Sequence, residues 1–466
     1  MFEAEFNGPS SGTPYIDVKF TADFKLEHRT VAVDGFYDGE GVYRVRFMPD
    51  AEGEWTFTTH SNRPELNGKS GRLVCVAPAS GNHGPVVVRK TWHFGYADGT
   101  PYLPFGTTCY AWTHQGDSLE DQTLATLKQA PFNKMRMCVF PKSYAFNRNE
   151  PPEYAFARDG AVNDYTRING KFFRRLEKRV AQLQQLGIEA DLILFHPYDR
   201  WGYSNMGAEV DDRYLRYVIA RLAPYRNVWW SLANEWDLVR TKSLPDWDRF
   251  FRIVQETDPY QRLRSIHHSK VMYDHGKPWV THASIQGDDF EKIPSYLDTF
   301  RKPVVYDECK YEGNIQQRWG NLSAQEMTRR FWIGTVAGAY VGHGETYLNA
   351  EEVLWWSKGG VLHGESAPRI ALLRKLVEGN APGGLTPIVN PYYPGASVPN
   401  QYYLYFLDYH QPALAEFDLP AGVQFQADVI DPWSMSVTRL DGVYQGKSQL
   451  KLPGKPYLAV QFRRAV

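Results

Sequence analysis

The feature that most constrains the fold is an alternation of short apolar runs with amphipathic stretches between residues 86 and 382. Strand–helix alternation over roughly 250 residues or more is the pattern of a (β/α)8 barrel, and we predict that fold here. The stretch 267–277 shows no clear helical pattern, so the fifth and sixth strands are the least defined. The apolar runs are residues 102–107, 132–140, 188–195, 228–232, 263–266, 279–281, 304–306 and 339–341. The expected helices are residues 119–129, 172–186, 213–222, 247–256 and 324–337.

Both ends of the chain change to period-two alternation, which is typical of half-buried strands. It is clearest at residues 42–47, 401–406 and 457–462, with turn-forming Pro and Gly between such segments. We therefore predict an α/β protein with three domains. These are an N-terminal β-sandwich (1–85), a catalytic (β/α)8 TIM barrel (86–382) and a small C-terminal β domain (383–466).

Composition narrows the class of partner. The formal net charge is -1, so electrostatics favours neither nucleic acid nor an anionic membrane as a partner. The 4 cysteines show no CxxC spacing and indicate reduced thiols. We see no signal peptide at the N-terminus and no apolar run near the ~20 residues that span a bilayer, so we expect a cytoplasmic protein. The sequence leaves the oligomeric state open.

Two glutamates stand where apolar runs end. Glu235 follows the fourth run and Glu308 follows the seventh. Because barrel active sites lie at the C-terminal ends of the strands, both carboxylates should face one pocket. Glycoside hydrolysis uses such a pair, one carboxyl group protonated to release the leaving oxygen and the other ionised.

Three nearby carboxylates compete with Glu308 for the catalytic role. Asp307 should point to the opposite side of the strand by alternation, into packing or a salt bridge. Glu312 lies farther into the following loop. Glu345 ends the eighth strand, where we expect it to bind a sugar hydroxyl.

The sequence resembles the large clan of retaining (β/α)8 glycosidases, clan A, which includes the family 5 cellulases. The resemblance rests on Asn234-Glu235 ending strand four and Glu308 ending strand seven. It implies that Glu235 is the acid/base, Glu308 the nucleophile and Asn234 a ligand of the sugar 2-hydroxyl. It also implies that Arg136, on strand two, orients the nucleophile. His196 and His282 would end strands three and six and contact substrate.

A closer resemblance covers nearly the whole chain. Six short sequence segments resemble those of a poorly characterised bacterial group of glycosidases. They are residues 35–39, 46–50, 53–55, 59–62, 355–360 and 364–366. Its members carry a β-sandwich before the barrel and a small β domain after it. This resemblance leaves the sugar, the anomer and the linkage open, as well as endo or exo action.

Aromatic and metal-binding residue types complete the candidate site. We expect one or two aromatic side chains in strand-end loops to stack on sugar rings, and the long loop 141–165 to form one wall of the pocket. His196, His267, His268, His282 and His343 are candidate metal ligands. No HExxH motif occurs, and most of these histidines lie on different predicted strands, which disfavours a catalytic metal. No cofactor is expected. The aromatic candidates are Tyr110, Trp112, Trp201, Trp236, Trp355 and Trp356.

The predicted reaction is double displacement on an oligosaccharide, with net retention and carboxyl groups about 5–5.5 Å apart. A transglycosylase using the same residues is one alternative. A non-catalytic carbohydrate-binding protein is another, although the presence of both carboxylates, Arg136 and Asn234 argues against it. A metal-dependent hydrolase using the histidines is a weaker third alternative.

Overall fold

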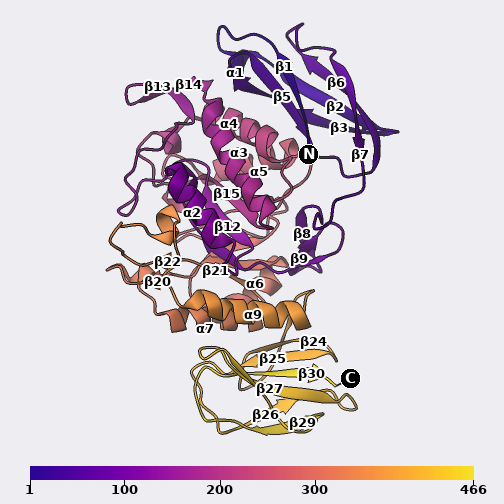
Figure 1. The fold of residues 1–466 in the computed structure, drawn as a ribbon, viewed down its shortest axis with the longest axis vertical. Coiled ribbons are helices and arrows are strands. Elements are labelled where there is room, and N and C mark those ends of the chain that lie inside the picture. Colours follow the sequence, from indigo (N-terminus) through magenta and orange to yellow (C-terminus); the bar gives the residue numbers. More distant parts are fainter. Residues whose placement is uncertain (466) are drawn as a thin grey trace.

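A parallel β-barrel forms the centre of the molecule (Figure 1). The computed structural model describes residues 1–465. The strands follow the order β17-β16-β15-β12-β11-β21-β19-β18, and the barrel is nearly closed, with Thr281 donating its backbone N–H to Arg264 across the gap at 2.9 Å. The predicted TIM-barrel fold is therefore confirmed. The strands are β11 (Gly106–Thr108), β12 (Lys134–Cys138), β15 (Glu189–Phe195), β16 (Val228–Ala233), β17 (Arg264–Ser265), β18 (Ala283–Gln286), β19 (Val304–Glu308) and β21 (Tyr340–His343).

Amphipathic helices cover the barrel, and the five expected ones are present with shifted ends. α3 shows why they form: the Asn169 side chain caps its first turn, and Phe172, Phe173 and Leu176 are buried on one face. Residues 266–282 contain no helix, as their sequence pattern indicated. The helices are α2 (Asp117–Leu127), α3 (Gly170–Gln185), α4 (Ala208–Leu222), α5 (Leu244–Thr257), α6 (Ile293–Phe300), α7 (Ala324–Val336) and α9 (Ser366–Asn380), with the shorter α1 (Pro14–Asp17) and α8 (Trp355–Lys358).

Two predicted barrel strands were misplaced. Pro101 and Tyr102 belong to β10, in an antiparallel sheet with β9 (His93–Tyr96) and β8 (Val86–Arg89), and the first barrel strand begins only at Gly106. Pro104 lies between the two segments and has no N–H to continue a ladder. The sixth strand is Ala283–Gln286, not 279–281. Phe94 and Tyr102 from the small sheet pack against Trp229, Leu263 and Val305 and close the N-terminal mouth of the barrel.

The N-terminal domain is a β-sandwich of two antiparallel sheets, β1-β5-β4 and β3-β2-β6-β7 (Figure 1). Alternate side chains of both sheets meet in one core that includes Phe24, Phe47 and Trp55. Phe24 and Phe47 stack at 4.2 Å between ring centroids. The strands are β1 (Phe2–Asn7), β2 (Phe20–Leu26), β3 (Arg29–Asp34), β4 (Phe36–Gly39), β5 (Val42–Phe47), β6 (Gly53–Ser61) and β7 (Ser70–Cys75).

A buried ion cluster joins this sandwich to the barrel helices. Glu177 of α3 accepts from Arg46 of β5 at 2.7 Å and from Arg221 of α4 at 2.6 Å. Arg221 also binds Asp38 of β4 at 2.8 Å. Burial alone would raise the pKa of Glu177, but the two guanidinium groups hold it below its ordinary value. The contacts fit a bracing role for the sandwich.

The C-terminal domain packs on α7, which lies with α9 between it and the barrel (Figure 1). Trp332 of α7 stacks on Phe406 with centroids 5.8 Å apart. The domain contains the sheet β23-β24-β25-β30-β27-β28 and the pair β26-β29. Its strands are β23 (Thr386–Ile388), β24 (Gly395–Val398), β25 (Tyr402–Phe406), β26 (Leu414–Asp418), β27 (Phe425–Asp431), β28 (Ser436–Arg439), β29 (Lys447–Lys451) and β30 (Ala459–Arg464).

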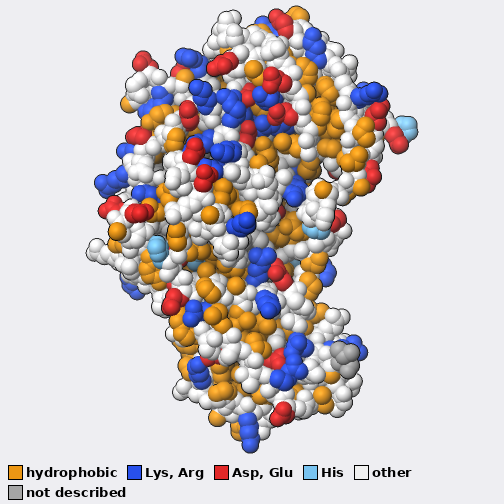
Figure 2. Space-filling view, in the orientation of Figure 1, with side chains coloured by type: hydrophobic (Ala, Val, Ile, Leu, Met, Phe, Trp, Pro, Cys, Tyr) orange, Lys and Arg blue, Asp and Glu red, His pale blue; other side chains and the backbone are white. Residues whose placement is uncertain are grey.

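The surface carries mixed charge. Acidic and basic side chains are interspersed on the face seen in Figure 2, with no large area of one sign. Within residues 1–465, no helix has both the length and the apolar character needed to cross a bilayer.

Candidate active site

The two glutamates lie at the C-terminal end of the barrel. Glu308 is the last residue of β19, and Glu235 follows the end of β16 by two residues. Glu235 is 6% exposed and has φ 50° and ψ 56°, in the left-handed region that non-glycine residues rarely adopt. Its neighbours hold this backbone: Asn234 donates its N–H to Phe195 and Trp236 donates to His267, both at 3.0 Å. Such strain clusters at functional sites.

Glu308 lies among hydrogen-bond donors. The Tyr110 hydroxyl donates to Glu308 Oε2 at 2.9 Å, and His267 Nε2 lies 3.3 Å from the same oxygen. Burial would raise the pKa of Glu308. The His267 hydrogen bond, with the charges of Arg136 and Lys142, outweighs burial and lowers this pKa to about 2. Glu308 is therefore ionised at neutral pH.

Side-chain contacts connect the two glutamates. The Tyr110 hydroxyl is 3.1 Å from Asn234 Oδ1, and Asn234 Nδ2 donates to Glu235 Oε2 at 3.4 Å. Tyr198 donates to the same oxygen of Glu235, while Gln286 Nε2 donates to Oε1 at 3.3 Å. The structure thus brings Tyr110, Asn234, Glu235 and Glu308 together, as the sequence predicted.

Arg136 reaches Glu308 only through a third residue. Its Nη1 donates to the Tyr110 hydroxyl at 2.9 Å, and that hydroxyl donates to Glu308. One layer deeper, Lys134 Nζ lies 2.5 Å from Asp191 and 2.7 Å from Asp307. Asp307 is thus held in a salt bridge, one of the two environments that strand alternation suggested.

Lys142 is a site residue that the sequence did not reveal. Its Nζ lies 3.5 Å from the ring centroid of Tyr110, 4.4 Å from that of Tyr198 and 4.6 Å from that of Trp356. Burial lowers the pKa of Lys142 to about 8. Aromatic faces attract a cation and so hold it without an ion pair. No motif marks Lys142; only its position, four residues after the end of β12, could have indicated it.

Further site residues also escaped the sequence reading. His267 entered only as a possible metal ligand, and Tyr198, Gln286 and Tyr311 were not proposed. Tyr311 lies with its hydroxyl 3.3 Å from that of Tyr110. A signal for Gln286 would have been a correct sixth strand, because it is that strand's last residue.

His282 was placed wrongly at the pocket. It precedes β18 and therefore lies at the N-terminal mouth of the barrel, with its ring 5.6 Å from that of Phe94 and 5.3 Å from that of Trp229. Burial lowers the pKa of His282 to about 3. Because the sixth strand begins later than its apolar run suggested, this histidine belongs to the packing of the opposite end.

Glu345 does not present a free carboxylate to a sugar. It is 1% exposed, and its two oxygens accept the backbone N–H groups of His363 at 2.6 Å and Gly364 at 2.8 Å. His196, at the end of β15, is likewise buried, with Nε2 3.2 Å from the carbonyl oxygen of Phe140. Both residues therefore support the site from behind and do not line it.

The predicted tryptophans are mostly packing residues. Trp112 and Trp355 are buried in the main core, where Trp355 donates to Thr107 Oγ1 at 2.8 Å. Trp201 is 5% exposed and donates to Glu150 at 2.7 Å. Trp236 is partly exposed beside Glu235 and packs edge-on against Tyr273.

The aromatic cluster beside Tyr110 consists of Trp356, another of the expected strand-end tryptophans, with Trp319 and two residues of the loop 141–165. Trp356 packs edge-on against Tyr110 at 5.5 Å and lies 4.9 Å from Trp319. Tyr144 and Phe146, from the loop 141–165, join the same cluster. That loop also contains the hairpin β13 (Phe156–Asp159) and β14 (Val162–Ile168). Its first residues therefore lie against Trp356 beside Tyr110.

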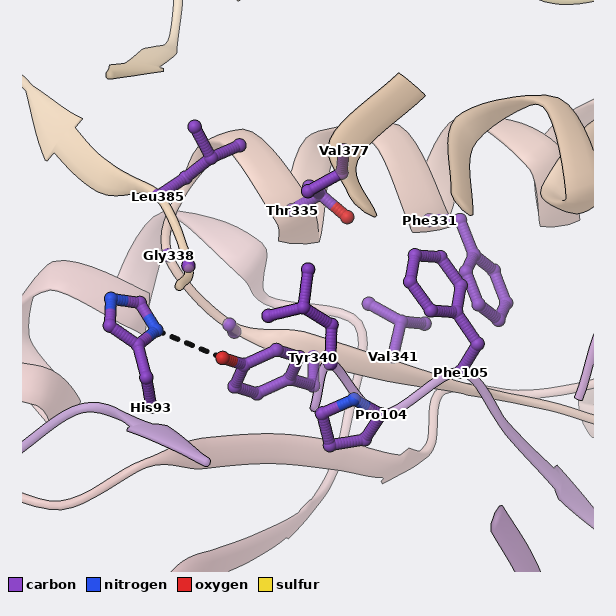
Figure 3. A pocket seen from close by; sticks show the side chains of 13 residues that line it. His93, Pro104, Phe105, Phe331, Thr335, Gly338, Tyr340, Val341, Val377 and Leu385 are labelled. Atoms are coloured by element: carbon purple, nitrogen blue, oxygen red, sulfur yellow. Dashed lines mark hydrogen bonds between the residues drawn. The ribbon is translucent and has the colours of Figure 1, made fainter. Parts of the chain in front are cut away.

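A separate apolar cavity lies near the N-terminal end of β21, between that strand, α7 and α9 (Figure 3). Leu385, Phe331 and Val377 line it, and the only hydrogen bond drawn there joins His93 Nδ1 to the Tyr340 hydroxyl at 2.9 Å. It contains no carboxylate and lies at the end of the barrel away from Glu308.

The barrel is parallel and nearly closed, and a glutamate lies at the C-terminal end of its fourth strand and of its seventh strand. This arrangement is that of the glycoside hydrolase class of TIM barrels. Residues 89–375 match the catalytic domain of the apiosidase-like family, and the chain belongs to that family. Residues 1–62 and 392–463 match two domains of unknown function, DUF5060 and DUF5605.

Solved structures agree with this class. A Bacteroides vulgatus protein provisionally described as a glycoside hydrolase is 38% identical, with TM-score 0.95, over 100% of this chain and 98% of the other. A family 5 glycoside hydrolase from Bacteroides vulgatus is 14% identical, with TM-score 0.67, over 84% of this chain and 95% of the other, and shares the fold. A search of curated protein sequences gave no significant match.

Proposed function

We propose that the protein is a retaining glycoside hydrolase with Glu308 as nucleophile and Glu235 as acid/base. The observation that carries the proposal is the pair of glutamates at the ends of β16 and β19, joined through Tyr110 and Asn234. Their environments differ: the pKa of Glu308 is lowered to about 2, whereas the donors around Glu235 are neutral side chains. Such asymmetry suits a nucleophile beside a proton donor.

In the first step the Glu308 carboxylate attacks the anomeric carbon. The glycosidic C–O bond breaks, and Glu235 gives its proton to the departing oxygen. In the second step Glu235 takes a proton from water, whose oxygen attacks the same carbon and releases Glu308. Tyr198 and Gln286 hold the Glu235 carboxyl group in place for both proton transfers.

The substrate class follows from the family. Its name puts apiosides first among the glycosides to be tested, followed by aryl glycosides and short oligosaccharides. The Trp356–Trp319–Tyr144 cluster offers aromatic faces on which a sugar ring could stack. An apioside is therefore the first substrate to test, with the other glycosides of the panel after it.

The test is hydrolysis of that panel by the wild type, Glu235→Gln and Glu308→Gln, with Glu256→Gln as control because Glu256 is an exposed residue of α5. We expect both site variants to lose about 10²–10⁴-fold in kcat while the control keeps full activity. Proton NMR of the first product should show the anomer of the substrate. Full activity in either site variant, or an inverted first product, would overturn the proposal.

The two alternatives give different results. A transglycosylase would transfer the sugar to an added acceptor in preference to water. A carbohydrate-binding protein would bind a glycan in calorimetry without cleaving it. The low pKa of Glu308 and its contacts with Tyr110 and His267 favour catalysis, because simple binding does not need an ionised carboxylate held this way.

A further inference from the structure

Two carboxylates and a histidine meet outside the barrel wall. They are Glu312 of β20 (Glu312–Gly313), His343 at the end of β21 and Glu345 of β22 (Glu345–Thr346). Each offers one ligand atom, and these atoms all lie within 4.8 Å of one another. Glu312 and Glu345 are opposite each other in the parallel pair β20-β22, and the three residues are 0%, 0% and 1% exposed.

The two carboxylates have no cationic partner. Among residues 1–465, no Lys or Arg forms an ion pair with Glu312 or Glu345. Their donors are the backbone N–H groups of residues 363–366, the hydroxyl of Ser366 and the hydroxyl of Tyr347 at 3.0 Å. Two buried negative charges this close are costly without a positive charge or a proton.

The third residue has an unused nitrogen. His343 Nδ1 is 3.0 Å from Thr107 Oγ1, whereas Nε2 is fully buried and has no hydrogen-bond partner in the described part of the chain. The ring stacks on Phe132 at 4.6 Å. Metal-binding histidines are typically oriented in this way, with one nitrogen hydrogen-bonded behind and the other free for the ion.

We propose that Glu312, His343 and Glu345 bind one divalent transition-metal ion of the zinc class. Two carboxylates and a divalent cation are neutral together, which removes the charge imbalance. An imidazole nitrogen favours Zn²⁺ over Ca²⁺ or Mg²⁺, which take oxygen ligands. Each oxygen of Glu345 accepts one backbone N–H and keeps a second lone pair for an ion. Both oxygens of Glu312 already accept two donors, so an ion there takes the place of the Tyr347 or the Ser366 hydroxyl.

The role of this ion is structural. The carboxylates hold the chain at residues 363–366, where α9 begins, and so anchor the segment that runs back from α9 to α8. That segment carries Trp356, whose carbonyl accepts the N–H of Tyr110 at 2.9 Å. The metal would thereby stiffen the aromatic wall beside Glu308 without touching substrate.

The experiment measures metal content and thermal unfolding of the full-length protein purified without a metal-chelating column. We expect about one Zn²⁺ per chain by mass spectrometry. Stripping with a chelator should lower Tm by roughly 3–6 °C, and added Zn²⁺ should restore it. His343→Phe, which keeps the stack on Phe132, and Glu345→Gln should both lose the metal and the response, whereas the exposed Glu365→Gln should keep both.

In the competing state, Glu312 and Glu345 share a proton and bind no metal. This state fits the pKa of Glu345, which burial raises to about 7. That state predicts less than about a tenth of an ion per chain and no change of Tm with chelator or Zn²⁺. Either result overturns the metal site, as does a zinc response that persists in His343→Phe. These readouts do not depend on glycosidase activity, so they stand even if the proposed function fails.

Discussion

Replacing His267 tests why Glu308 is ionised. His267 Nε2 contacts Glu308 at 3.3 Å, and this hydrogen bond is the largest of the interactions that lower the Glu308 pKa against the opposing effect of burial. His267→Leu removes the donor from a buried site. His267→Gln places an amide nitrogen near the position of Nε2 and serves as the matched control.

The magnitude follows from the pKa itself. A fall from 4.5 to about 2 corresponds to about 3 kcal/mol in favour of the charged carboxylate. A hydrogen bond to a charged group contributes about 1.5–3 kcal/mol, so its loss should raise the pKa by roughly one to two pH units. The lowered pKa means that the ionised form persists down to about pH 2 in the wild type and is lost at a higher pH in the variant.

The assay is kcat/KM between about pH 2.5 and 8, in short assays at the acidic end, on any substrate that the panel identifies. In the wild type, we expect no decrease of kcat/KM at acidic pH that is caused by protonation of Glu308. In His267→Leu, kcat/KM should decrease near pH 3–4 or above. His267→Gln should lie between the two. Identical acidic limbs in the wild type and His267→Leu, with both proteins folded by circular dichroism, would refute the reasoning.

Three further outcomes are expected. Tyr198→Phe removes a donor to Glu235 and should lower kcat about 10-fold or more with little change in Tm, as measured by steady-state kinetics. Glu177→Gln leaves Arg46 and Arg221 without their shared carboxylate and should cost about 3–5 kcal/mol in urea unfolding. Because the Glu177 pKa is lowered, the wild-type advantage should hold above pH 4.5 and vanish as pH falls through the folded pKa. His282→Ala should cost roughly 2–4 kcal/mol while leaving kcat/KM of the folded enzyme unchanged.

The sequence predicted the barrel because strand and helix periodicities are local properties. Asn234, Glu235 and Glu308 could be placed for the same reason, since each follows an apolar run whose end faces the pocket. The errors have a shared cause. Short apolar runs such as 102–107 and 279–281 do not show where a strand enters the sheet, and a shift of a few residues moved His282 from one end of the barrel to the other.

Residues that act through neighbours were beyond local patterns. Lys142 and Tyr198 lie in loops, and only the folded chain brings them beside Glu235 and Tyr110. Glu345 was predicted to bind substrate because it follows strand eight. In the structure, both of its carboxylate oxygens accept backbone N–H groups of residues 363–364. Such contacts depend on how distant segments pack, which period and spacing do not encode.

The charges inside the barrel explain why His267 should matter more than Arg136. Lys134 supplies one positive charge to two aspartates, Asp191 and Asp307, and leaves one negative charge unbalanced. The Arg136 guanidinium interacts with both of these aspartates as well as with Glu308. Within residues 1–465, its one side-chain hydrogen bond goes to the Tyr110 hydroxyl. Arg136 is therefore shared, whereas His267 contacts Glu308 directly. Substitution of Arg136 should accordingly disturb the barrel interior first, and substitution of His267 should disturb the Glu308 carboxylate first.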